Sequence, residues 1–177
     1  AGDYIINFNG YVTFAAGSSL DVDLHNDTAT TGVDIVNVAA GAHLITSGTG
    51  TITIKVSKNV VLNTGSSLET VNGGITVEAN QQATATAGTF YGVSLTSSII
   101  ASSGTGQVIV KGRGGDAGSG QVGILLQGVC RISGGATGTA TVVGTGGPST
   151  SGSDYGVIAT STGSQITSLG SDVSVTG

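Results

Sequence analysis

The chain has 177 residues and a net charge of −5 at pH 7, and only 8% of its residues are charged. Its length favours one domain, and its 32 glycines follow no Gly-X-Y period, which excludes collagen. The five lysines and arginines are scattered, so nucleic acid is not an expected partner. No apolar run approaches the ~18 residues of a membrane-spanning helix, so no membrane span is predicted.

A nine-residue pattern recurs about every 24 residues in the first half of the chain. It reads VTFAAGSSL at 12–20, VNVAAGAHL at 36–44 and VVLNTGSSL at 60–68. Such self-similarity indicates a small unit stacked on copies of itself. Stacking predicts that equivalent residues of the three copies lie above one another in three ladders. The glycine ladder is expected at a corner that needs positive φ or close backbone approach. The three ladders are Val12, Val36 and Val60; Leu20, Leu44 and Leu68; and Gly17, Gly41 and Gly65.

Within the repeats, apolar residues alternate with polar ones, as in Ile52, Ile54 and Val56. A period of two places these side chains on one face of a strand, and no segment has the apolar spacing of a helix. The sequence therefore predicts an all-β fold, a single-stranded right-handed parallel β-helix, or β-solenoid. About seven coils of three short strands are expected, with strands of neighbouring coils ~4.8 Å apart.

The second half of the chain repeats on a longer period. Its units begin at Gly92, Gly123 and Gly156, about 31–33 residues apart, and each later carries an alternating strand that ends in glycine. A similar strand at 75–77 fits both series, which indicates that the short and long repeats are one stack.

Residues 1–177 are therefore predicted to form a single domain. Short coils of about 24 residues are expected over 1–91, and longer coils of about 31–33 residues over 92–177. Three polar loops follow equivalent strands, the two later ones rich in Gly, Ser and Thr, so they should protrude on one face and form the main contact surface. These loops are 80–89, 112–122 and 144–155.

The densest charged stretch is Asp21-Val-Asp23-Leu-His25-Asn-Asp27. If its two apolar residues face inward, Asp21, Asp23 and His25 point outward, which suits a solvated outer face. The alternative is a Ca²⁺ site formed by Asp21, Asp23 and Asp27, because carboxylate oxygens are the ligands that calcium prefers. No other cofactor is expected.

The sequence offers no catalytic site. Glycoside hydrolysis needs two carboxylates across a groove, and Asp21 with Asp23 is the only close pair of carboxylates. The basic residues that a polysaccharide lyase would use are not clustered. An enzyme is therefore not predicted, and the alternative is a carbohydrate-binding or polysaccharide-degrading β-helix similar to a tailspike or lyase.

Cys130 is the only cysteine, so an internal disulfide is excluded, and a buried structural thiol is expected. His25 and His43 lie in distant repeats and are not expected to activate it. The outward threonines Thr51 and Thr53 do not recur at the period of the short repeat, so an ice-binding face is not predicted.

The units at 92–115 and 154–177, with their Gly-Val openings and strands such as Val108-Ile-Val-Lys-Gly112, resemble tandem β-strand repeats of very large bacterial surface proteins. Those proteins are similar to filamentous haemagglutinin and autotransporter passenger domains. The resemblance covers most of the chain. It implies secretion, an extracellular or cell-surface location, a β-helical stalk, and roles in adhesion, biofilm or envelope coating, without shared catalytic residues.

The expected function is that of a non-enzymatic structural or adhesive β-solenoid, acting as a rigid stalk or a self-stacking fibre subunit. The sequence ends at Gly177 without a polar capping segment, and repeat rods normally need one. The expected partners are therefore end-to-end copies or the continuation of a longer chain, together with a glycan or host-cell surface. A calcium-stabilised adhesin module is a further alternative.

Overall fold

The computed structural model describes residues 2–25, 32–148 and 152–177, and these contain strands and turns but no helix. The strands form three parallel sheets of six strands each. Sheet A contains β1 (Ile5–Phe8), β4 (Ile35–Val38), β7 (Asn59–Leu62), β10 (Val93–Thr96), β13 (Ile124–Gln127) and β16 (Val157–Ala159). Sheet B contains β2 (Tyr11–Thr13), β5 (His43–Ile45), β8 (Ser67–Thr70), β11 (Ile99–Ser102), β14 (Arg131–Gly134) and β17 (Gln165–Ser168). Sheet C contains β3 (Leu20–Leu24), β6 (Ile52–Val56), β9 (Ile75–Ala79), β12 (Val108–Arg113), β15 (Ala140–Thr145) and β18 (Val173–Thr176).

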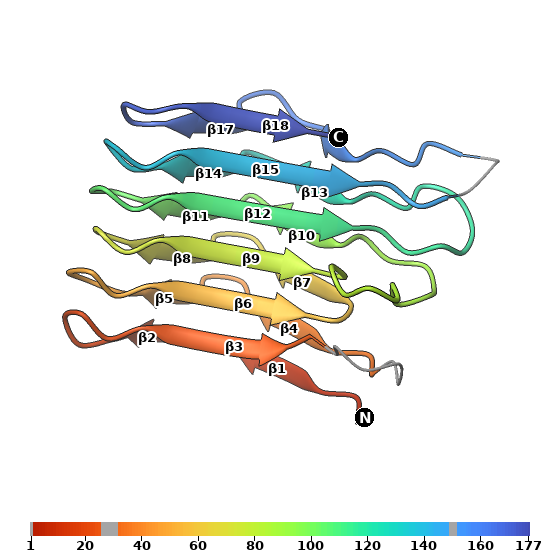
Figure 1. The fold of residues 1–177 in the computed structure, drawn as a ribbon, viewed down its shortest axis with the longest axis horizontal. Helices are drawn as coiled ribbons and strands as arrows, with labels where there is room; N and C mark the ends of the chain where they lie inside the picture. The colour runs from red at the N-terminus through yellow and green to blue at the C-terminus, as the bar shows by residue number, and fades with distance from the viewer. Residues whose placement is uncertain (1, 26–31, 149–151) are drawn as a thin grey trace.

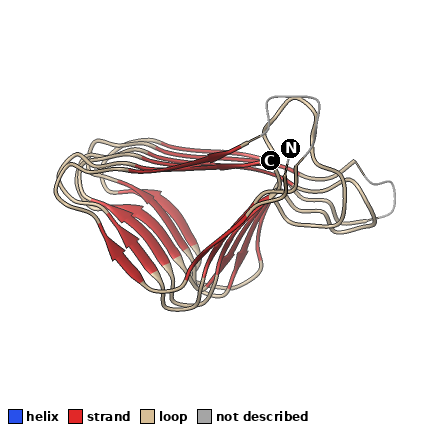
Figure 2. Cartoon of the chain, turned by 90° about the horizontal axis from the view of Figure 1, so that it is seen from below, coloured by secondary structure: helices blue, strands red, loops and turns tan. Residues whose placement is uncertain are grey.

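Three consecutive strands, one from each sheet, make one coil, and each strand pairs with its counterpart in the neighbouring coils. Figure 1 shows the coils stacked on one another, and Figure 2 shows their three-sided cross-section. The predicted parallel β-solenoid is therefore confirmed. From β1 to β16 the chain makes five turns, and β17 and β18 follow. The expected seven coils were too many, because most coils are longer than the short repeat of the first half.

The register defines the length of each coil. Ile5 pairs with Ile35, which is the spacing of a long coil, and most of the stack has similar spacings. Only between the second and third coils do partners lie closer in sequence, as in the pairing of Ile35 with Asn59. The short coil expected throughout 1–91 therefore occurs once, because only there does sheet C lead to sheet A without a long loop.

The predicted ladders hold for the second and third copies of the nine-residue pattern but not for the first. The confirmed pairs are Val36 with Val60 and Leu44 with Leu68. Val12 instead pairs with Leu44 in sheet B, and Leu20 pairs with Ile52 in sheet C. The first copy spans the corner from sheet B to sheet C, whereas the later copies span the corner from A to B. Each corner is a glycine turn between apolar strands, so one pattern suits either corner.

The glycines of this pattern have the predicted backbone conformation. Gly17, Gly41 and Gly65 have φ values of +80°, +69° and +75°, where L side chains are strained. Only Gly41 and Gly65 share a corner, however. Gly17 lies beside Gly48, on which an added Cβ would be 3.2 Å from the Gly17 nitrogen. The expected stack of three glycines was therefore wrong for its first member.

The interior of the tube is filled by alternate, inward-facing aliphatic side chains from all three sheets. Fully buried examples are Val36, Leu44, Ile54, Val77, Leu95, Val110, Ile124 and Ile132. Residues between them face outward, as in β6, where buried and partly exposed positions alternate. The hydrophobic effect acting on this continuous interior is the main stabilising contribution.

Sheets C and A approach each other closely at their shared corner in the later coils. An added Cβ on Gly144 would lie 1.9 Å from the Gly156 carbonyl oxygen, and one on Gly112 would lie 2.2 Å from that of Gly123. This close approach explains why β12 and β15 have glycine as their fifth residue and why a glycine directly precedes the first strand of the next coil.

The long loops connect sheet C to sheet A, so they all leave the tube at one corner (Figure 2). Polar side chains join each loop to the next. Asp116 Oδ1 accepts a hydrogen bond from the Gly88 nitrogen at 2.8 Å, and Asp154 Oδ1 accepts one from the Gln121 nitrogen at 2.6 Å. Gln121 Oε1 in turn accepts from the Phe90 nitrogen at 2.7 Å. The loops therefore extend the coil-by-coil stacking beyond the tube.

Among the described non-glycine residues, only Asn80 and Ser97 have positive φ, and the φ of Ser97 is 44°. Its carbonyl accepts a hydrogen bond from the Gly65 nitrogen, so the turn is fixed by the neighbouring coil. We expect Ser97→Gly to stabilise the protein by up to about 1 kcal/mol, because it relieves a left-handed conformation that costs L residues energy. Urea unfolding measures the change. Ser94→Gly, in β10, is the control and should destabilise; equal losses at both positions would contradict the argument.

Candidate functional site

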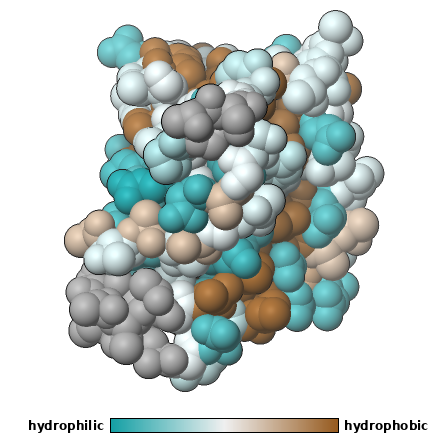
Figure 3. All heavy atoms as spheres, turned by 90° about the vertical axis from the view of Figure 1, so that its right-hand side faces the viewer, coloured by the Kyte–Doolittle hydropathy of each residue, from teal (hydrophilic) through white to brown (hydrophobic). Residues whose placement is uncertain are grey.

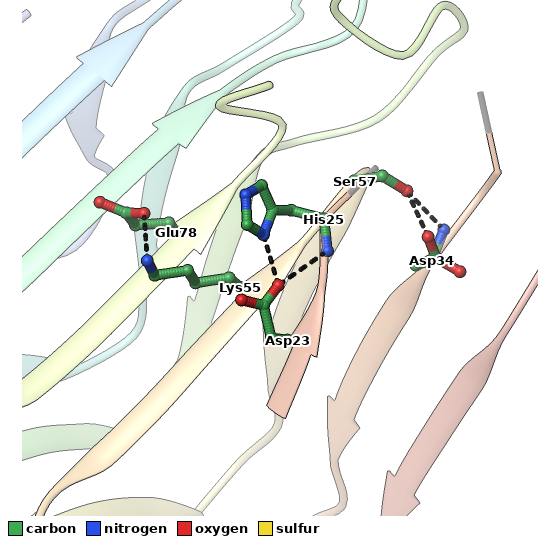
Figure 4. A network of polar contacts seen from close by, with 6 residues as sticks. All are labelled: Asp23, His25, Asp34, Lys55, Ser57 and Glu78. Atoms are coloured by element: carbon green, nitrogen blue, oxygen red, sulfur yellow. Dashed lines mark hydrogen bonds and ion pairs between the residues drawn. The ribbon is translucent and has the colours of Figure 1, made fainter. Parts of the chain in front are cut away.

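A row of charged residues of alternating sign runs along the outer face of sheet C over four consecutive coils. Asp23, Lys55, Glu78 and Lys111 occupy paired positions on β3, β6, β9 and β12. Lys111 Nζ lies 2.9 Å from Glu78 Oε1, and Lys55 Nζ lies 3.7 Å from Glu78 Oε2 (Figure 4 shows the Lys55–Glu78 pair). We call these four residues the charge ladder. Opposite charges in directly paired positions stabilise a sheet modestly.

Asp23, at the lower end of the charge ladder, is held by His25. Its Oδ1 contacts His25 Nδ1 and accepts a longer hydrogen bond of 3.4 Å from the His25 backbone nitrogen (Figure 4). Partial burial alone would raise the pKa of Asp23. The hydrogen bonds from His25, and then the charges of His25 and Lys55, outweigh burial and lower this pKa below its usual 3.8.

This lowered pKa predicts an acid-side loss of stability. A carboxylate whose pKa is lower in the folded state stabilises the protein above its unfolded-state pKa and loses that contribution as the pH falls through the folded-state pKa. We expect the slope of Tm between about pH 5 and about pH 2 to be shallower in Asp23→Asn. The change should be small, since the side chain is 51% exposed. Asp21→Asn is the matched control, and an identical slope in Asp23→Asn and the parent would refute the assignment.

The proposed calcium ligands are only partly described. Asp21 and Asp23 both point outward from β3, as predicted, and they lie opposite Thr53 and Lys55. Asp27 lies outside the described residues. Within 2–25, 32–148 and 152–177, no three His, Cys, Asp or Glu side chains form a group suited to a metal ion. Calcium binding by Asp21, Asp23 and Asp27 stays a prediction.

A further acidic residue, Asp34, is buried at the corner between sheets C and A. Its Oδ1 accepts a hydrogen bond from the Tyr4 nitrogen at 3.0 Å, and its Oδ2 accepts one from Ser57 Oγ at 2.8 Å (Figure 4 shows Asp34 and Ser57). The Asp34 nitrogen donates to Ser57 Oγ at 3.0 Å. These contacts join the first three coils, so Asp34 has a structural role that the sequence analysis missed.

His43 on the outer face of sheet B has a serine and a carboxylate nearby. Its Nδ1 lies 2.7 Å from Ser67 Oγ and 3.9 Å from Glu69 Oε1, and its ring stacks on Tyr11 at 4.3 Å. A nucleophilic triad places serine and carboxylate on opposite ring nitrogens, whereas both lie at Nδ1 here. The contacts therefore fix the position of the imidazole ring without forming a triad.

Cys130 is buried, as predicted. Its Sγ lies 3.4 Å from the carbonyl oxygen of Leu95 and 3.2 Å from that of Gln127, which share its single S–H donor. The thiol is thus part of the tube interior.

A polar groove of about 470 Å³ runs along the edge of sheet C, beside the turns that lead from sheet B. Its lining comes from four coils and consists of neutral residues, principally threonines. It includes Thr51, Thr53, Asn72, Thr76, Gln107 and Thr139. We call it the threonine groove. Sequence spacing did not indicate it, because its threonines do not recur at the period of the nine-residue pattern.

Compared with known proteins, the chain matches no family model, no curated protein and no solved structure. In the described part of the chain, no helix is long and apolar enough to cross a bilayer. The fold itself defines the class of architecture, a parallel β-solenoid.

Proposed function

We propose that this protein is a non-enzymatic structural and adhesive β-solenoid of a bacterial cell surface or extracellular matrix. It acts as a rigid rod whose ends stack on further β-solenoid coils. The extracellular location and the adhesive role rest on the resemblance of its repeats to those of large surface proteins. We further propose that the coils wind in the right-handed sense, since connections between parallel strands of one sheet are right-handed in about 98% of cases.

One observation carries the proposal: the apolar interior is exposed at both ends of the described stack. In the last coil, Val173 and Val175 pair with buried Ala140 and Val142, yet they are 44% and 51% exposed. In the first coil, the inward residues Ile6, Phe8 and Val12 are only partly buried. Figure 3, which views the stack from the side, shows hydrophobic side chains in its upper and lower parts.

Stacking of another coil would bury these side chains and pair the free backbone groups of the edge strands. Unpaired strand edges promote association, and buried apolar surface contributes roughly 25 cal/mol per Å². We propose that a second copy of this chain stacks on each end, because both ends have the same three-sheet cross-section. The rod then grows by adding coils in the pairing that already joins neighbouring coils.

The test is the length distribution of the purified protein at increasing concentration. We expect electron microscopy and sedimentation velocity to detect end-to-end rods of uniform width. Val175→Lys should give single short rods, because it places a charge on the apolar end face. Ser174→Lys points outward on the same strand and should assemble like the parent. Single rods at every concentration, or assembly that is unaffected by Val175→Lys, would reject end-to-end stacking.

A further inference from the structure

The threonine groove lies outside the hydrophobic tube and apart from its ends. Thr53 and Thr76 are paired on the outer face of β6 and β9. Thr51, Gly74, Gln107 and Thr139 each precede the first residue of a sheet C strand in successive coils. The groove therefore follows the stacking direction, and four coils at ~4.8 Å spacing give it a length of about 14 Å.

Gly74 makes the groove hollow. It stands between Thr51 and Gln107 in this row and has no side chain to fill the space. Its φ is outside the positive range, and an added Cβ would be 3.3 Å from the Gln107 carbonyl oxygen. Neighbouring Gly73 differs, because a Cβ there would lie 1.9 Å from the Gly50 oxygen. The backbone thus needs glycine at 73 but not at 74.

Several polar side chains in the groove are not used by the fold. The side chains of Thr53, Thr76, Gln107 and Thr139 make no hydrogen bond within the described residues. Asn72 Oδ1, by contrast, accepts hydrogen bonds from the nitrogen and hydroxyl of Thr105 at 3.3 and 3.4 Å. Hydroxyl and amide groups both donate and accept, so the free groups suit a ligand with many hydroxyls.

The charge of the groove restricts the ligand further. Among the described residues, no lining side chain is charged. The nearest lysines along β6 and β12 belong to the charge ladder, where both contact Glu78. An anionic chain would therefore lack a free cation, and an apolar ligand would leave the polar groups unpaired.

We propose that the threonine groove binds a neutral, extended oligosaccharide, lying along the rod and held by hydrogen bonds from successive coils. This oligosaccharide site rests on the adhesive part of the proposed function and names the class of ligand for that adhesion. In the segments that the structure describes, no aromatic side chain lines the groove for stacking, so binding at one groove is weak. Stacked copies would present many grooves in a row and bind a polysaccharide more tightly through multivalency.

The proposal is tested by titrating the whole protein, below the concentration at which it assembles, with cellohexaose, laminarihexaose and maltohexaose. Protein NMR or calorimetry reports the affinity, and hexagalacturonic acid is the charged comparison. We expect at least one neutral hexasaccharide to bind, and the charged one to bind at least about tenfold more weakly, because it meets no free cation.

Two variants locate the site. Gly74→Gln fills the groove, and Thr76→Val removes one hydroxyl while keeping the shape. Thr76→Val should weaken binding by about two- to tenfold, the effect of a lost neutral hydrogen bond. Gly74→Gln should weaken it at least as much, because its side chain occupies the space of the ligand. Thr141→Val is the matched control, since Thr141 lies on the same outer face of sheet C but does not line the groove. Thermal melting verifies that each variant is folded.

Absence of binding by all three neutral sugars would overturn the inference, as would equal binding of hexagalacturonic acid. Binding that survives both Gly74→Gln and Thr76→Val would place the ligand elsewhere and overturn it too. Failure here leaves rod assembly untouched, because assembly is measured by microscopy and sedimentation without sugar. Failure of Val175→Lys to block stacking would equally leave the titration unaffected.

Discussion

Leu44→Asp is expected to unfold the protein under conditions in which the parent is stable. Leu44 is fully buried and stands in the interior of the tube between Val12 and Leu68. A carboxylate there would have no partner, and burying an unpaired charge costs several kcal/mol or forces the group to become neutral. That cost is comparable with the stability of typical domains, about 5–15 kcal/mol. Far-UV circular dichroism and urea unfolding at pH 7 measure the effect.

The matched control for Leu44→Asp is Ile45→Lys. Ile45 is the next residue of β5, but it points outward and pairs with Glu69 on β8. A lysine there faces an opposite charge, so the free energy of unfolding of the variant should lie within about 1 kcal/mol of that of the parent. If Leu44→Asp also melted like the parent, the division of β5 into inward and outward residues would be wrong.

Much of the fold was predictable because the sequence shows two periods directly, the alternation of residues within strands and the recurrence of the glycine turns. Alternation in segments such as Ile52–Val56 identifies strands and their inner face, and the recurring glycine turns identify a stack. Which strands pair, and in which register, was harder to predict from the sequence. Residues 12–20 and 36–44 read alike although they turn different corners, since a glycine between apolar strands is all that each corner requires.

The candidate site was harder to predict than the fold. The charge ladder joins Asp23, Lys55, Glu78 and Lys111, and the step from Lys55 to Glu78 is shorter in sequence than the other two. No single repeat length connects the four residues, so they read as scattered charges. The threonine groove was missed for the same reason, and because its depth depends on an absent side chain at Gly74. Both features become visible only when the loop lengths, and hence the register, are known.

Gly73→Ala is expected to destabilise the protein strongly, since the turns from sheet B to sheet C stack with their backbones in contact. Added Cβ atoms on Gly50, Gly73, Gly106 and Gly138 would lie only 1.9–2.2 Å from the carbonyl oxygen of the preceding turn. The Gly73 turn is also fixed by Thr70, whose Oγ1 donates to the Gly73 oxygen at 2.6 Å. Neither the Gly73 turn nor the Gly50 turn below it can move apart without breaking strand pairing in the adjacent sheets.

We expect a cost of about 3 kcal/mol or more, at the upper end for overpacking, which corresponds to a fall in Tm of about 6–12 °C for a chain of this size. Differential scanning calorimetry measures it. Gly74→Ala is the control one residue away, where an added Cβ would be 3.3 Å from the nearest atom. It should stay within about 1 kcal/mol of the parent, because a small shift relieves this tight contact and the lower conformational entropy of the unfolded chain offsets its cost. Equal tolerance at both positions would mean that the coils separate more easily at this corner than the stacked turns imply. The rod would then owe its rigidity to the ladders of sheets A, B and C alone.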